Sequence, residues 1–169
     1  MFGYIIFFSY ISVGKTKSMM AREKMVKGYC RQGTIKCRQV MDRIIKSARK
    51  KGTITAYEHR YLSEVTVWCV DQRRGRAYYR HNDITIPKWS LTEEKGCGYI
   101  TWYVAHELAH MLADERWGDT RGHCLDFYRA MVDICPRQHQ KHEYGYQKRS
   151  PKKLRLARAI QKEKGYDRR

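Results

Sequence analysis

The chain has 169 residues, a hydrophobic fraction of 42% and a formal net charge of +18 at pH 7. This length indicates one domain with an added arm, and the hydrophobic content is sufficient for a buried core. The excess of basic residues favours a polyanionic partner, usually nucleic acid, over a generically basic surface. No C-x-x-C pair occurs among the six cysteines, which excludes a four-cysteine zinc ribbon.

The first 25 residues begin with about thirteen mostly apolar positions. This run is shorter than the about 20 apolar residues that a membrane-spanning helix needs. A signal peptide carries its positive charges before the apolar run, whereas Lys15 and Lys17 follow it here. We therefore expect no stable membrane insertion, no secretion, and a cytoplasmic or DNA-associated location. The segment is either a buried strand or helix, or an extension created by the choice among several early methionines.

The first predicted element is a basic helix over residues 34–50, and Gly52 ends its pattern. Its apolar side chains recur at helical spacing, with basic residues on the other faces. The apolar stripe consists of Val40, Met41, Ile44, Ile45 and Ala48.

Three short strands are predicted next. Residues 64–70 are rich in β-branched and aromatic side chains, residues 71–76 favour a turn, and residues 77–81 favour a returning strand. Residues 83–87 form a third strand that stops at its proline. The aromatic residues in and near these strands, Trp68, Tyr78, Tyr79 and Trp89, are expected in the core or in the wall of a cleft.

Helical periodicity returns over residues 98–115, whose apolar stripe can pack on the sheet. A polar loop with two glycines follows, and residues 123–134 favour another helix that stops before Pro136. The order of helix, three strands, two helices and basic tail predicts an α+β fold. We expect a compact domain around a small, three-stranded, mainly antiparallel sheet.

Residues 104–127 carry the strongest chemical signal, VAHELAHMLADERWGDTRGHCLDF. His106 and His110 are four residues apart, so on a helix both imidazoles lie on one face and can bind one tetrahedral ion. Glu107 lies beside them and can reach a water on the metal without being a ligand. Zinc lowers the pKa of such a water toward about 7, and a carboxylate can take its proton during attack on a carbonyl. The alternative is a surface helix with two histidines and a glutamate.

A catalytic zinc site needs a third protein ligand and one open position. Ala113 and Arg116 stand where the extended metzincin motif has glycine and histidine, so that subclass is excluded. We expect His123 to be the third ligand, because thirteen residues after the motif allow a second helix to bring its first turn back to the metal. Asp119 and Asp126 are the competing candidates.

The segments HELAH and DTRGHCLDF together resemble the SprT/Spartan-like zincin proteases, whose pattern is H-E-x-x-H, a short loop and G-H-x-x-x-F. The matching residues are His106, Glu107, His110, Gly122, His123 and Phe127. The resemblance covers about residues 34–135. It implies a minimal zincin in which the three histidines bind Zn²⁺, Glu107 is the general base, and the substrates are proteins bound or crosslinked to DNA.

Two features depart from the pattern of that family. Cys124 follows the third histidine, where the family often has glycine. A basic tail over residues 136–169 stands where the family has a cysteine-rich zinc ribbon, so any binding of DNA would have to use different residues.

The tail contains twelve Lys/Arg and three Asp/Glu after Pro136, a net charge of +9. Part of it has an amphipathic helical pattern, and the alternative is a partly disordered tail that aids solubility. The basic residues expected to contact nucleic acid are Lys148, Arg149, Lys152, Lys153, Arg155 and Arg158. By contrast, residues 91–118 around the motif contain two basic and five acidic residues, which predicts an acidic metal cleft flanked by basic arms.

Two weaker signals lie near the start of the tail. Cys135, His139 and His142 could form part of a second metal site, although a buried cysteine followed by solvated histidines is the preferred interpretation. Tyr144 and Tyr146 lie among basic residues and could stack on unpaired bases.

The sequence therefore predicts an uncertain apolar segment at residues 1–25, a SprT-like metallopeptidase domain at residues 26–135 and a basic, partly helical tail at residues 136–169. The expected function is zinc-dependent hydrolysis of protein or peptide substrates, with nucleic acid as a partner of the tail. One alternative is a non-catalytic, zinc-stabilised nucleic-acid-binding protein with this fold, and another is a basic interaction protein without metal. Glu107 favours the enzyme, because a purely structural site needs no base.

Overall fold

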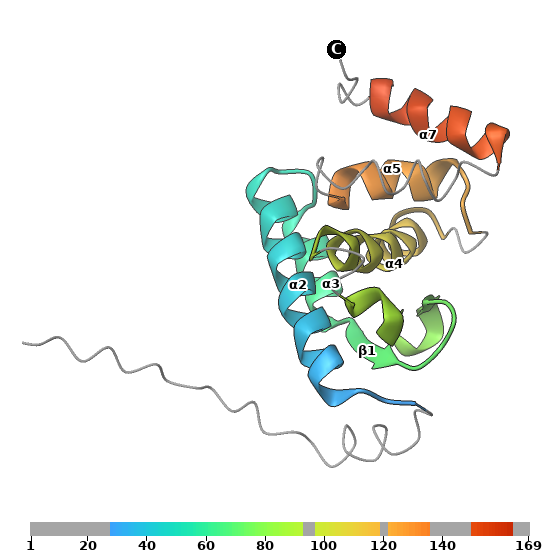
Figure 1. The fold of residues 1–169 in the computed structure, drawn as a ribbon. Coiled ribbons are helices and arrows are strands. Elements are labelled where there is room, and N and C mark those ends of the chain that lie inside the picture. The colour runs from blue at the N-terminus through green and yellow to red at the C-terminus, as the bar shows by residue number, and fades with distance from the viewer. Residues whose placement is uncertain (1–27, 93–96, 119–121, 136–149, 164–169) are drawn as a thin grey trace, which may run out of the picture.

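The computed structural model describes residues 28–92, 97–118, 122–135 and 150–163. These segments form an α+β fold in which helices pack around a small mixed sheet (Figure 1). Within the described ranges, we find no helix that is both long enough and apolar enough to cross a membrane. The N-terminal segment 1–25, Lys148, Arg149 and the residues of the two weaker tail signals after Cys135 lie outside the described residues.

Helix α2 (Arg31–Lys50) confirms the first predicted helix and begins three residues earlier. Its predicted apolar stripe is buried against the sheet and the other helices, together with Gly33 and Cys37. A second helix, α3 (Ala56–Glu64), was missed by the periodicity. Its start is encoded by a capping box, because Thr55 accepts a hydrogen bond from the Glu58 amide while the Glu58 carboxylate accepts one from the Thr55 amide.

The sheet consists of β1 (Thr66–Val70), β2 (Arg76–Tyr78) and β3 (Asp83–Pro87), in the order β1-β3-β2. Strand β3 pairs parallel with β1 and antiparallel with β2. The prediction of a mainly antiparallel sheet with a β1–β2 hairpin at residues 71–76 is therefore wrong. The tight reversal lies one strand later, between β2 and β3, where residues 79–81 form a 3-10 turn and Asn82 adopts a left-handed conformation.

Side chains outside the sheet explain why residues 71–76 do not form that hairpin. The Gly75 amide donates to the Tyr103 hydroxyl (2.8 Å), and the Trp89 indole N–H donates to the Arg73 carbonyl (3.0 Å). These bonds hold the chain after β1 against the helix that carries the histidines and against the 3-10 turn that follows β3. Strand β3 then takes the central place, which suits its fully buried Ile84 and Ile86.

Helices α4 (Cys97–Trp117) and α5 (Leu125–Ile134) pack against each other and against α2, and α4 also packs on the sheet. Leu108, Met111 and Leu112 of α4 are fully buried, as the predicted stripe requires. The core also contains Cys135, which is 5% exposed at the end of α5. Figure 1 shows α4 between the sheet on one side and α5 on the other.

Helix α7 (Pro151–Glu163) is the helix formed by the described residues of the tail, and it packs on α5 on the side away from α4 (Figure 1). Ile160 is 2% exposed and belongs to the core, and Leu156 packs against it. The basic residues Lys152, Arg155 and Arg158 are exposed. The tail helix is therefore docked on the domain with a basic outer face.

A buried ion-pair network joins α4 to α3 and α5 at the position where a metzincin would carry its third histidine. The Arg116 guanidinium donates to Glu58 (2.6 Å), to Asp133 (2.6 Å) and to the Thr53 carbonyl (3.1 Å). The three charged side chains are only 17%, 11% and 8% exposed. The Arg116 hydrogen bond holds the pKa of Glu58 below its usual value, against the opposing effect of burial.

Replacing Arg116 with Gln should destabilise the fold by about 3 kcal/mol, because two largely buried carboxylates lose their cation. The Arg43→Gln control on the exposed face of α2 removes the same charge and should cost less than about 0.5 kcal/mol. Because folding lowers the pKa of Glu58, the stability that its ion pair with Arg116 contributes is fully present above the unfolded pKa. This stability is lost as pH falls through the folded pKa. Urea denaturation should therefore give a smaller difference between wild type and Arg116→Gln at pH 3 than at pH 7; equal stability at pH 7 would contradict the assignment.

Candidate functional site

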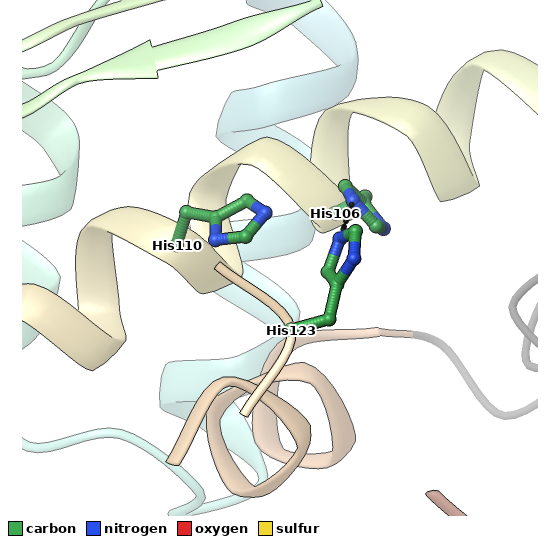
Figure 2. A group of neighbouring side chains, drawn as sticks. All are labelled: His106, His110 and His123. Carbon is green, nitrogen blue, oxygen red and sulfur yellow. Dashed lines mark hydrogen bonds between the residues drawn. The ribbon is translucent and has the colours of Figure 1, made fainter. Parts of the chain in front are cut away.

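The three predicted histidines come from two elements that lie far apart in the sequence. His106 and His110 project from one face of α4, one turn apart. His123 lies in the short segment before α5, two residues ahead of its first residue, rather than in the helix itself. Packing of α5 on α4 brings His123 over the two motif histidines (Figure 2).

The imidazoles converge closely. Nε2 of His106 and Nε2 of His123 are 2.9 Å apart, as the dashed line in Figure 2 marks. The ring centroids of His110 lie 5.2 Å from His106 and 5.1 Å from His123. One nitrogen from each histidine lies within 4.8 Å of the other two, close enough for the group to hold a metal ion.

No family model, curated protein or solved structure matches the chain. What the site can do therefore follows from its own geometry and chemistry.

The donor set fits a transition-metal ion. Neutral imidazole nitrogen is a good ligand for zinc, and three histidines with an open position make a known type of catalytic zinc site. His106 is only 5% exposed, and its Nε2 lies 2.9 Å from Nε2 of His123. Two imidazole nitrogens at this distance can share one proton or one metal ion, and the third histidine beside them favours the ion.

The Phe127 ring contacts all three imidazoles. This ring is fully buried, and its centroid lies 4.3 Å from His110, 4.6 Å from His123 and 4.9 Å from His106. Trp102 adds a further contact with His106 at 5.4 Å. The imidazoles are therefore oriented by packing, which fixes the direction of their nitrogens before any ion binds.

Glu107 lies beside the histidines and is 5% exposed. It lines the same cavity as all three of them. The backbone of Gly75 approaches it so closely that a Cβ atom there would lie 2.8 Å from the Glu107 carboxylate and 2.6 Å from the Thr85 carbonyl. Only glycine fits at this position, and the segment around it forms one wall of the site.

The cavity over the histidines has a volume of about 730 Å³. Its walls carry aromatic side chains, among them Tyr99, Tyr103 and Trp89, and three arginines that lie before β2 or at its first residue. Trp89 confirms the expectation of a cleft wall, whereas Trp68 is buried in the core. The arginines were missed because residues 71–76 were interpreted as an ordinary turn.

The prediction of an acidic cleft is wrong for the described residues. Glu107 is the one carboxylate among the residues that line the cavity, beside three arginines. Asp114 and Glu115 do not line it, and Glu115 accepts a hydrogen bond from the Tyr57 hydroxyl (2.6 Å). A charge count along the chain failed here because a helix distributes neighbouring residues over different faces.

The competing third ligands do not join the described group. Asp126 is held by Arg129 at 3.3 Å, and it is not among the residues that could hold the metal. Asp119 lies outside the described residues.

Replacing His123 with Ala should therefore lower the zinc bound per chain well below one, because two histidines alone leave an incomplete ligand set. Asp126→Ala removes a nearby carboxylate in the first turn of α5 and should leave the zinc content unchanged. Metal analysis after dialysis against a weak chelator measures both variants, and circular dichroism checks that each is folded. If His123→Ala retains its zinc and Asp126→Ala loses it, Asp126 and not His123 is the third ligand.

Proposed function

We propose that this protein is a zinc-dependent metalloendopeptidase that hydrolyses peptide bonds, with substrates among DNA-associated proteins. The observation that carries the proposal is the position of Glu107, which lies beside a convergent three-histidine group and opens into the same large cavity. A structural metal site is closed by protein ligands and needs neither a base nor an open cavity. The resemblance of the two motif segments to SprT/Spartan-like proteases supports the same activity.

The chemistry is divided between the ligands and the base. His106, His110 and His123 would hold the ion, which when bound supplies a Lewis acid that polarises a carbonyl and makes water more acidic. Glu107 accepts the proton of the attacking water and delivers it to the departing amine. Its burial beside the Gly75 backbone restricts its motion and excludes bulk water from one side of it.

The walls of the cleft suit an extended polypeptide. Strand β2 is an outer strand of the described sheet, and Arg76 and Ala77 of this strand line the cavity. A peptide can pair with the outer edge of such a strand through main-chain hydrogen bonds, which do not depend on its sequence. A peptide bound in this way would have its scissile bond next to Glu107.

Glu107→Gln preserves the shape of the side chain but cannot accept the proton, so it should lower the rate of proteolysis at least about 10²-fold. Zinc content should be unchanged, because Glu107 is not a ligand. The matched control is Glu115→Gln, which makes the same chemical change on the same helix outside the cavity and should retain activity. Activity is measured as cleavage of an unfolded test protein by wild type, Glu107→Gln and Glu115→Gln. Full activity of Glu107→Gln would refute the role of Glu107 as general base.

The nucleic-acid role belongs to helix α7 in this proposal. Lys152, Arg155 and Arg158 are exposed on it, while Leu156 and Ile160 attach it to the domain. A non-catalytic, nucleic-acid-binding protein with the same metal group remains the second candidate function, and this basic outer face is the feature that favours it. The two functions are compatible if α7 brings the cleft to substrates on DNA.

Neutral substitutions test α7 better than its deletion, because deletion would uncover the site that Ile160 fills. Replacing Lys152, Lys153 and Arg155 with Gln should weaken duplex DNA binding and reduce the log–log salt slope by up to about 2–3, at about 0.9 per phosphate. The control variant replaces three exposed basic residues of α2, namely Lys46, Arg49 and Lys50. Affinities measured at several salt concentrations should fall for the α7 variant alone; a loss confined to the α2 variant would move the DNA-binding surface to α2.

A further inference from the structure

Three arginines before and within β2 form a feature that the proposed chemistry does not use. Arg73, Arg74 and Arg76 are exposed, and all three line the cavity that holds the histidines and Glu107. We name them the arginine rim. Arg73, Arg74 and Arg76 also line a second hollow of about 330 Å³, together with Gln72 and Tyr78. The rim thus stands between two concave surfaces.

The position of the arginine rim is fixed by its backbone. The Gly75 amide is bonded to the Tyr103 hydroxyl of α4, and the Arg73 carbonyl is bonded to the Trp89 indole. A Cβ atom at Gly75 would lie only 2.8 Å from the Glu107 carboxylate, so the backbone of Gly75 lies close to it. The Cα atoms of Arg74 and Arg76 therefore each lie about 3.8 Å from the Cα atom of Gly75, next to the Glu107 carboxylate.

The rim has no internal counter-charge among the described residues. No ion pair joins Arg73, Arg74 or Arg76 to a carboxylate there. Arg116, by contrast, is paired with Glu58 and Asp133. Guanidinium groups bind carboxylates in a bidentate manner, and the rim presents three of them to the cavity, where a bound molecule can reach them.

We infer that the arginine rim selects substrates that carry Asp or Glu within about two or three residues of the cleaved bond. The spacing follows from the position of Arg74 and Arg76 on either side of Gly75, whose backbone lies close to the Glu107 carboxylate, and from the advance of an extended peptide by about 3.3 Å per residue. This inference rests on the proposed peptidase function. A peptide is favoured over nucleic acid as the partner of the rim because the rim shares one cavity with the reacting groups, whereas the exposed basic face of α7 lies beyond α5 (Figure 1).

Two sets of matched peptides test the inference. One set carries Glu at positions flanking a common cleavage site, and the other carries Gln at the same positions. In the wild type, the ratio of kcat/KM for the Glu peptide over the Gln peptide should be about three to ten, the size expected for partly screened charge contacts. Arg74→Ala/Arg76→Ala should bring the ratio near one, and Arg74→Glu/Arg76→Glu should bring it below one.

Arg60→Ala is the matched control, because Arg60 is exposed on α3 and does not line the cavity. It should leave the ratio unchanged. Zinc content and melting temperature should be unaltered in every rim variant, because the rim side chains are exposed. A second readout needs no turnover: fluorescence anisotropy on Glu107→Gln protein should show tighter binding of the Glu peptide and loss of that difference when the rim is changed.

The outcomes separate the two levels of the proposal. If no peptide or unfolded protein is cleaved, the peptidase function fails; the anisotropy difference then still reports on the rim. If cleavage occurs with equal rates for Glu and Gln peptides, the peptidase stands and the selectivity of the rim is refuted. A rim variant that alters the salt dependence of DNA binding, with an unchanged peptide ratio, would assign these arginines to nucleic acid and overturn the inference.

Discussion

Phe127 is fully buried where α5 meets α4, and its ring contacts the imidazoles of His106, His110 and His123. The site depends on this packing, because His123 comes from the segment before α5 and meets the motif histidines only when α5 is in place. Burial of a phenylalanine ring stabilises by about 2–3 kcal/mol, which couples the formation of the core to the formation of the metal group. Fold stability and the assembly of the three histidines are therefore linked through one side chain.

The sequence predicts those parts of the molecule that depend on local spacing. Histidines four residues apart on a helix must share a face, and the apolar stripe of α2 has to be buried. Helix α3 was missed although its capping box is visible as Thr55 and Glu58, because its nine residues carry only a weak apolar pattern. The predicted strand order was wrong for a different reason. The segment after β1 is held by hydrogen bonds in which the Gly75 amide donates to the Tyr103 hydroxyl and the Trp89 indole donates to the Arg73 carbonyl, and such long-range contacts leave no periodicity in the sequence.

Charge is distributed in the fold differently from its distribution along the chain. The acidic stretch around the motif suggested a negative cleft, yet Glu107 is the one carboxylate among the described residues of the cavity wall, and the arginine rim comes from a segment thirty residues earlier. The tail places its basic residues outward because Leu156 and Ile160 bind it to α5. The described residues therefore include basic surfaces with different surroundings, one in the cleft beside Glu107 and one on the outer helix α7. Their separation is consistent with separate partners.

The central claim is that His106, His110 and His123 hold one zinc ion beside a base that is not a ligand. Anomalous diffraction from crystals of the zinc-loaded protein, measured on both sides of the zinc absorption edge, tests it most directly. We expect one strong peak per chain, about 2.0–2.1 Å from one nitrogen of each histidine, with the Glu107 carboxylate beyond bonding distance and the fourth position facing the cleft. A peak bound by other residues, a Glu107 oxygen in the coordination sphere, or no peak among the three histidines would contradict it.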